Sequence, residues 1–342
     1  MREIRYIYII IGVALCLQSC HKESHPSNPE TESYAISMAP TSVGTSRTPI
    51  NNIDDLKENG FVVYGHSTVN NTDGSNAQQQ VFGGDKVTYD TNEEAWGYTN
   101  TQYWNLAADY RFGAYALTEF YQGASITKNK DEDNEDIITS LTFGNLPQWQ
   151  AYNNNATDLI VATSQGAAID YLYGSGSVDL EFQHAYAQLE VKVVKDVTLT
   201  KDYQLTGLTY SNIPHKDGKN SYTLDYTTPE NSKWDDINPN EANTLPAFSG
   251  SAVVIDDKGT NTTFNHLVVP FSSQFQVSVA YTVSEGTQST SVSGSATVDL
   301  ELTPGQKMVL TLSISSTYKI TPVLQIAEWE PVDIDEDDKF NW

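Results

Sequence analysis

The chain has 342 residues, more than one hydrophobic core usually holds, so its length predicts about two domains. It carries 19 Lys and Arg against 44 Asp and Glu, which gives a formal net charge of −25. Such an acidic surface repels phosphate backbones and anionic headgroups, so nucleic acid and anionic membrane surfaces are poor partners for the folded part.

Residues 1–19 have the plan of a signal peptide. Arg2 and Arg5 precede an uncharged, mostly apolar run at residues 6–17. A helix needs about 20 residues to cross a bilayer, and this run is too short for that, so we expect the segment to direct export and then to be removed.

The end of the apolar run has the order of a bacterial lipobox, Leu17-Gln18-Ser19-Cys20. We therefore predict that Cys20 is lipidated, becomes the first mature residue and anchors the protein in the outer membrane, where buried methylenes hold it. The alternative is an ordinary signal peptide with an incidental cysteine.

The mature chain is expected to contain no disulfide, because Cys16 leaves with the signal and Cys20 is then the remaining cysteine. Hydrophobic burial must therefore stabilise the fold without the staple that is common outside the cell. Residues 20–33 are polar and aperiodic and include two prolines, which indicates a tether.

From residue 34 onward, apolar and polar residues alternate with the period of two that is typical of strands with one buried face. The clearest runs lie at residues 189–193, 275–283 and 308–314, with shorter apolar runs at 61–64, 110–117, 159–162 and 267–271. The pattern predicts an all-β fold, a many-stranded antiparallel sandwich. One short helix is predicted at 52–59, where Asn52 can cap the start and Gly60 can end it.

The turn-rich stretch at residues 173–177 falls between two sets of strands and is the candidate domain boundary. We predict an N-terminal domain at residues 34–174 and a C-terminal domain at 178–342. Two long polar stretches, 128–136 and 217–243, are predicted to be surface loops.

The sequence contains no G-x-S-x-G elbow, P-loop, H-E-x-x-H or C-x-x-C motif, so we predict no catalytic residue, no cofactor and no enzyme. The acidic stretch 131–136 has carboxylates at alternate positions but lacks the Gly and the final Glu of an EF-hand loop. We interpret it as a solvated loop and predict no metal site. A hydrolase would need convergent carboxylates in a cleft, and no constellation indicates one.

Four aromatic residues lie close together in the sequence: Trp96, Tyr98, Tyr103 and Trp104. Packing inside a sandwich is the favoured interpretation, since sandwiches bury many aromatics. The alternative is a platform that stacks on sugar rings, which would make the protein a surface glycan-binding lipoprotein.

Over residues 34–329 the chain resembles the fimbrillin family, the subunits of the type V pili of Bacteroidetes. The resemblance rests on the order and spacing of several short pieces, which are the lipobox, Thr45-Ser46-Arg47, Phe61-Val62-Val63-Tyr64, Tyr103-Trp104, Tyr110-Arg111-Phe112-Gly113-Ala114-Tyr115, Asp158-Leu159-Ile160-Val161-Ala162, Leu180-Glu181-Phe182-Gln183-His184-Ala185, Pro304-Gly305 and Ile326-Ala327-Glu328-Trp329.

The resemblance implies two transthyretin-like β-sandwich domains, export as a lipoprotein, and proteolysis after an arginine that removes the first strand. By position that arginine is Arg47, although Pro49 leaves the fit of a protease open. The partners implied are other pilin subunits, in a homo- or heteropolymer at the cell surface, together with a host protein or glycan as adhesion ligand. Stalk, anchor and tip roles all stay open.

The vacated groove would accept a strand from a neighbouring subunit, by the general mode in which an extended segment completes an open sheet. In the first strand, Tyr34, Ile36 and Met38 alternate with smaller residues. The C-terminal tail offers Val332 and Ile334 as a short apolar row, and residues 324 and 326 form a rival donor row.

Overall fold

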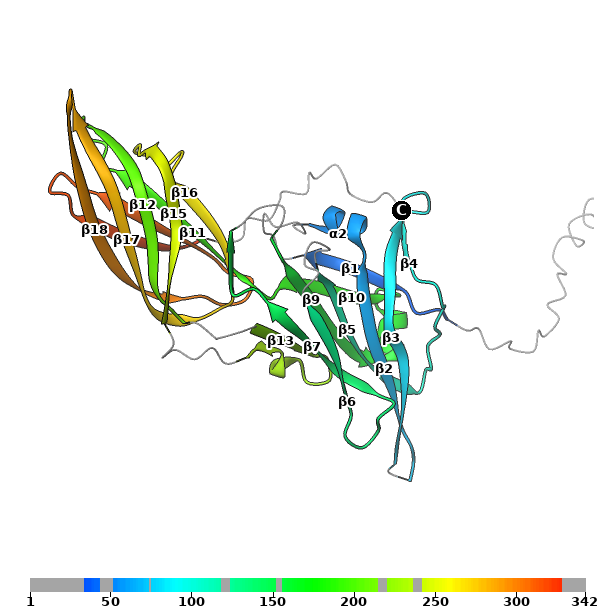
Figure 1. Ribbon diagram of the computed structural model, residues 1–342. Helices are drawn as coiled ribbons and strands as arrows, with labels where there is room; N and C mark the ends of the chain where they lie inside the picture. Colours follow the sequence, from blue (N-terminus) through cyan, green and yellow to red (C-terminus); the bar gives the residue numbers. More distant parts are fainter. Residues whose placement is uncertain are drawn as a thin grey trace, which may run out of the picture. The chain divides into compact units, whose positions relative to one another are not determined.

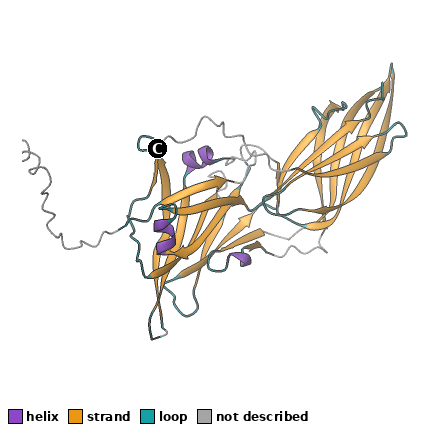
Figure 2. Cartoon of the chain, turned by 180° about the vertical axis from the view of Figure 1, so that it is seen from behind, coloured by secondary structure: helices purple, strands orange, loops and turns teal. Residues whose placement is uncertain are grey.

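The computed structural model describes residues 34–43, 52–73, 75–117, 124–151, 156–214, 220–235 and 242–327. Strands dominate these residues and form four sheets (Figures 1 and 2). The predicted all-β fold of antiparallel β-sandwiches is confirmed. The described residues from Ile36 onward belong to one compact unit.

Two sheets build the first sandwich. The larger has seven strands in the order β1 (Met38–Val43), β10 (Val178–His184), β9 (Leu159–Ala167), β5 (Ala108–Leu117), β2 (Phe61–Asn70), β3 (Asn76–Asp90) and β4 (Ala95–Gly97). The smaller has the order β14 (Lys233–Trp234), β13 (Asn220–Asp225), β7 (Ile138–Leu146) and β6 (Ser125–Lys130).

Two further sheets build the second sandwich. One has the order β20 (Ile320–Ala327), β19 (Lys307–Ile314), β11 (Ala187–Lys195), β16 (Thr263–Val268) and β8 (Trp149–Ala151). The other has the order β15 (Ala242–Val254), β12 (Asp202–Pro214), β17 (Ser272–Glu285) and β18 (Gln288–Glu301). Two pairings are parallel, β1 with β10 and β11 with β19.

The core of the second sandwich follows directly from the alternation in the sequence. Along β17, the side chains of Phe275, Val277, Val279 and Tyr281 are buried, and the residues between them are partly exposed. β11 and β19 bury their aliphatic rows in the same core. Because the side-chain period of a strand is two, each strand presents one apolar face and one polar face.

The seven-stranded sheet of the first sandwich has a core on each face. On one face, Tyr115 packs against Phe143 of β7. The same cluster extends to Tyr226, which follows β13 directly. On the other face, Tyr110 and Phe112 belong to a cluster covered by the short helices α2 (Ile53–Asn59) and α3 (Ala168–Tyr173) and by the segment before β5. A 3-10 turn, η1 (Pro229–Asn231), precedes β14.

Helix α2 forms where the sequence predicts it. The side chain of Asn52 accepts a hydrogen bond from the backbone N–H of Asp55 at 2.9 Å, and Leu56 is buried against the core. Gly60 ends the helix with φ of +71°, and a Cβ there would lie 2.5 Å from the carbonyl oxygen of Val87. A left-handed conformation and a close backbone approach both require glycine at this position.

Sheet membership does not follow the predicted boundary at residues 173–177. β9 and β10 flank that stretch and pair with each other in one sheet. β8, from the first half of the sequence, pairs with β16, whereas β13, from the second half, pairs with β7. Pairing partners that are far apart in the sequence leave no mark in a local pattern, so sheet membership cannot be read from a turn-rich stretch.

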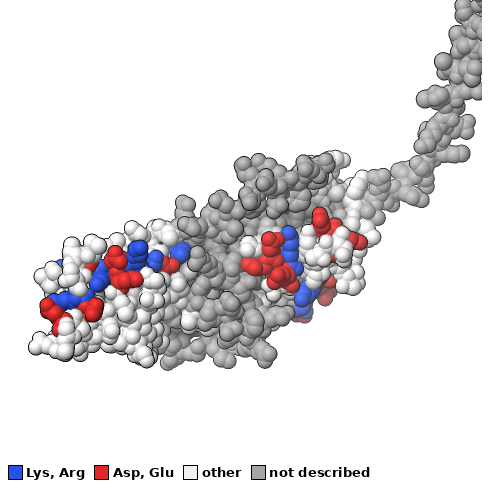
Figure 3. Space-filling model, turned by 90° about the horizontal axis from the view of Figure 1, so that it is seen from above, with Lys and Arg blue, Asp and Glu red and all other residues white. Residues whose placement is uncertain are grey.

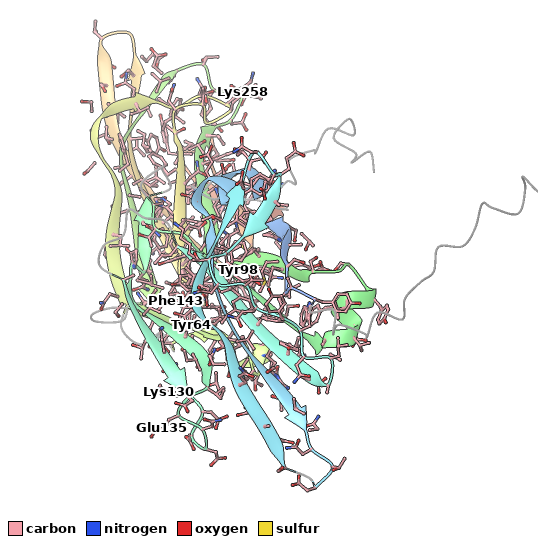
Figure 4. All side chains as sticks on the ribbon, turned by 90° about the vertical axis from the view of Figure 1, so that its right-hand side faces the viewer. Tyr64, Tyr98, Lys130, Glu135, Phe143 and Lys258 are labelled. Atoms are coloured by element: carbon pink, nitrogen blue, oxygen red, sulfur yellow. The ribbon has the colours of Figure 1, made fainter. Side chains whose placement is uncertain are left out.

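One predicted surface loop is wrong in part. Within residues 217–243 the structure contains β13 and β14, and Tyr222, Leu224 and Trp234 are buried. The alternation of these residues with polar ones is short and lies among Pro and Asn residues, which concealed it. The other polar stretch, 128–136, comprises the end of β6 and a turn, and Glu135 lies at the tip of that turn (Figure 4).

Candidate functional site: the first strand and its groove

β1 is an edge strand that pairs with one neighbour, β10, in parallel (Figure 1). The register joins Met38 to Val178 and Pro40 to Leu180, and then shifts by one residue so that Ser42 lies opposite Glu181. The extra residue, Thr41, makes a β-bulge next to the proline. Proline lacks a backbone donor, and edge strands and bulges are the places in a sheet that tolerate it.

Four side chains of this segment are buried: Ile36, Met38, Pro40 and Val43. The intervening residues are small and more exposed. Ile36, Met38 and Val43 belong to the same core cluster as Leu56 of α2 and Phe182 of β10. β1 therefore closes a hydrophobic core of the first sandwich from its edge.

Backbone hydrogen bonds hold the start of this segment on both sides. Ile36 donates its N–H to the carbonyl of Gln102 at 2.8 Å, and its own carbonyl accepts the hydroxyl of Tyr98 at 2.5 Å. The carbonyl of Ser37 accepts the N–H of Val178 at 2.8 Å. Burial raises the pKa of the Tyr98 hydroxyl, so it stays protonated and able to donate.

The core cluster that β1 closes contains aromatic and aliphatic side chains, which would form the floor of the groove that loss of β1 leaves. Phe61 of β2 packs edge-on against Phe182 of β10, with ring centroids 5.3 Å apart, and against Trp96 at the same distance. Val178 and Leu180 complete the β10 side. Such contacts make the floor rigid and apolar, and without β1 it would lie open to water.

The rim of the groove is acidic. Asp179 and Glu181 alternate with the buried residues of β10 and point to the exposed side. β1 itself carries no charged residue over Met38–Val43. On the face shown in Figure 3, acidic and basic side chains are interspersed.

The predicted lipidation and cleavage residues, Cys20 and Arg47, lie outside the described residues, as do the tether and the tail beyond Ala327. Ile36 and Met38 are buried as predicted for the first strand, but Tyr34 is 45% exposed. The apolar row of the segment therefore begins at Ile36.

The aromatic residues proposed as a sugar platform pack mainly into the core. The indole of Trp104 is 7% exposed and stacks on Tyr171 with ring centroids 5.1 Å apart. Trp96 packs on Phe61, and Tyr98 packs edge-on against Phe82. Tyr103 is 53% exposed and does not make a platform alone, so this geometry favours the core interpretation.

Sequence reasoning missed the side-chain partners of two of the buried histidines. His266 accepts the indole N–H of Trp149 on Nδ1 at 3.1 Å and bonds the hydroxyl of Tyr210 through Nε2 at 3.0 Å. Burial lowers its pKa to about 4. His184 contacts Asp158 at 2.8 Å, and both side chains are fully buried. Their partners lie on other strands, so no spacing in the sequence could have identified either pair.

Metal-ligand clusters and membrane-spanning helices are both absent from the described residues. No group of three or more His, Cys, Asp or Glu is placed there to hold a metal ion. None of the helices in this part of the chain is long and apolar enough to span a bilayer.

Several solved structures are similar to this chain. A candidate cell-adhesion protein from Bacteroides uniformis is 16% identical, with a TM-score of 0.39, and the match covers 88% of this chain and 100% of that one. The tip fimbrial protein Mfa3 from Porphyromonas gingivalis, truncated at its C-terminus, is 10% identical, with a TM-score of 0.35 and coverage of 86% and 98%. The fimbrial anchor protein Mfa2 from the same organism is 12% identical, with a TM-score of 0.32 and coverage of 80% and 90%.

The search among curated proteins gave no match. The model of the fimbrillin-like family matches residues 50–329, well over half of the chain. That range includes α2 and every strand except β1. The chain therefore belongs to the fimbrillin-like family, whose members are structural fimbrial subunits of the cell surface.

Proposed function

We propose that the protein is exported as a lipoprotein and serves as a structural subunit of a surface pilus, with a role in adhesion and none in catalysis. Assembly proceeds by proteolysis after Arg47, loss of the first strand, and insertion of a strand from another subunit. Family membership supports the pilus and the contact with other subunits. The shape of the site supports the exchange.

The observation that carries the proposal is that β1 closes a core of the first sandwich from the edge of its sheet. It has a single strand neighbour, it precedes Arg47 in the sequence by four residues, and its buried side chains close a core to which the rest of the sandwich contributes the floor. A cut after Arg47 would break the covalent link between β1 and α2. The strand would then be held by non-covalent contacts alone.

Loss of β1 leaves a state that a replacement strand can stabilise. With β1 in place, each of its buried aliphatic side chains stabilises the fold by about 1.5–3 kcal/mol. Without β1, the open edge of β10 would present unpaired backbone groups. A strand from a neighbour would restore the backbone pairing through its main chain and would fill the side-chain positions at alternate residues. Binding alone provides the driving force, so no catalyst is required.

The cleavage step is tested with protein that lacks the signal peptide. Limited trypsin treatment of the wild type is expected to release the segment before residue 48 and to start growth of rods, followed by electron microscopy and size-exclusion chromatography. Arg47→Ala should keep β1 and stay monomeric, whereas Arg47→Lys, which trypsin also cuts, should assemble. If Arg47→Ala assembles as well as the wild type, exchange is not the mechanism of this chain.

The anchor is tested separately in cells. Cys20→Ala should release the protein from the membrane fraction or leave an uncleaved precursor, because no sulfur is available for the lipid. Fractionation and the intact mass of the mature chain report the result. An unchanged membrane fraction together with an unchanged mature mass would remove the lipoprotein part of the proposal.

A further inference from the structure

Among the described residues the four sheets have eight edges, and all but one carry a feature that discourages pairing with another chain. Natural edge strands avoid such pairing by short length, proline, bulges or lysine. β4, β8 and β14 have three residues or fewer. β1, β15 and β20 each contain a proline, and β6 contains two lysines. These residues are Pro40, Pro246, Pro322, Lys128 and Lys130.

The remaining edge is β18, the outermost strand of its sheet, and it has none of these features (Figure 1). It has 14 residues, contains no proline and no lysine, and pairs with β17 without a register shift. Residues 288–298 carry no charge, and the first acidic residue is Asp299. A long, regular and uncharged edge of this kind is a place where another strand can pair.

The pairing with β17 fixes which backbone groups of β18 point outward. Leu302, directly after β18, donates its N–H to the carbonyl of Phe271 at 2.8 Å, and the ladder continues from this pair without a shift. Hydrogen-bonded and non-hydrogen-bonded pairs alternate in an antiparallel ladder. The even-numbered residues of β18 therefore bond to β17, and the odd-numbered residues direct their N–H and C=O groups to the free edge. The uncharged ones are Ser289, Ser291, Ser293, Ser295 and Thr297, and all are exposed.

Core packing holds β18 in place. Ala296 and Leu300 are buried in the core of the second sandwich. A Cβ on Gly294 would lie 2.8 Å from Cδ1 of Ile320, so the middle of β18 packs closely against the start of β20. The free edge is therefore already extended and ordered, and a partner strand would pay little to order it.

The charge distribution indicates which partner fits this edge. The chain has a formal net charge of −25, so two copies repel each other over most of their surface. β17 carries no charge from Ser272 to Ser284, so the strand next to β18 is uncharged as well. A second copy can therefore approach along β18 without placing acidic groups against acidic groups. A basic peptide would meet no carboxylate on residues 288–298.

We propose that β18 of one copy pairs antiparallel with β18 of a second copy, with Ser293 on the two-fold axis. This centre joins Gln288 of one copy to Val298 of the other, so the uncharged stretch pairs with itself along its whole length and Asp299 lies beyond the ladder. The contact goes beyond the proposed function and needs neither cleavage nor strand exchange. A single ladder of this size is a weak contact, so the chain is monomeric at the low concentrations of size-exclusion chromatography. Repetition between arrayed copies would strengthen it.

Cysteine cross-linking tests the pairing and its centre. The background chain lacks the signal peptide and carries Cys20→Ser and Arg47→Ala, so it keeps β1 and contains no other cysteine. Ser293→Cys places two thiols opposite each other with Cα atoms about 5.5 Å apart, within the range of a disulfide, so oxidation should give a covalent dimer. Ser289→Cys is the matched control, because the two copies of residue 289 would be about 26 Å apart along the strands.

A charge at the same two positions gives a second test without a covalent bond. Ser293→Lys should weaken the dimer severalfold, because like charges directly opposite each other destabilise strand pairing, and added salt should restore part of the loss. Ser289→Lys adds the same charge but lies opposite Thr297 of the second copy, so it should retain the dimer. Sedimentation equilibrium up to about 1 mM protein measures the association. Thermal unfolding shows that both variants fold.

A covalent dimer from Ser293→Cys and none from Ser289→Cys, together with weaker association of Ser293→Lys alone, supports the pairing. A background chain that stays monomeric up to about 1 mM overturns it, as does equal cross-linking of the two cysteine variants. Dimers that form only after truncation at Ala327 would show that the tail of the same chain covers the edge, which also overturns the pairing. All three contrary results leave the proposed function standing, because the background chain is not cleaved.

Discussion

At the scale of single residues, His266 has its tautomer set by its neighbours. The indole of Trp149 donates to Nδ1, so that nitrogen holds a lone pair and the ring proton lies on Nε2, directed at Tyr210. Burial also raises the pKa of the Tyr210 hydroxyl, which keeps it neutral. Protonation of His266 would therefore place a second N–H against the donor of Trp149 inside an apolar core.

This arrangement makes stability depend on pH. The folded pKa of about 4 is below the unfolded value of 6.5, so the unfolded state binds more protons between these values and stability falls as the pH falls through that window. The contribution is fully present above pH 6.5, and the loss on reaching pH 4 is about 3 kcal/mol. Urea unfolding at pH 7 and pH 4.5 should show the wild type losing more stability than His266→Phe. Equal losses in the two proteins would contradict the assignment.

At the scale of elements, α2 depends on its first residue. Asn52 is the cap whose side chain accepts the N–H of Asp55, and the helix packs Leu56 onto the core that β1 closes. Asn52→Ala should lower the free energy of unfolding by about 1 kcal/mol, whereas Asn52→Asp, which retains an acceptor, should be close to neutral. Chemical denaturation measures both, and equal stability of the Ala and Asp variants would count against the cap.

Elements with a strong local signal could be predicted, and those defined by distant partners could not. The rows of β11, β17 and β19 alternate because each buries one face, and α2 has a cap, an apolar face and a terminal glycine. β8 has only three residues, too few to show a period, and β18 alternates only from Val292 onward, after a polar and exposed first part. Of the site, the buried residues of the first strand could be predicted, but the bulge at Pro40 depends on the register with β10.

At the scale of the whole molecule, the sheets predict that the first half of the chain does not fold alone. A fragment of residues 34–174 lacks β10, which joins β1 to β9, and β13, which pairs with the central strand β7. We expect this fragment to show poor amide dispersion in NMR and no cooperative unfolding, in contrast to residues 34–342. A cooperative, well-dispersed fragment would show that the boundary at 173–177 does separate folding units.

The crossing of the chain between its sheets has a mechanical consequence. The backbone passes from the first sandwich to the second between β7 and β8, returns between β8 and β9, and passes across again after β10, after β12 and after β14. Tension applied along a filament would therefore be shared by five covalent connections instead of one linker. To separate the sandwiches, the load must first shear β8 from β16 and β13 from β7. These antiparallel ladders therefore resist a force that pulls on the subunit.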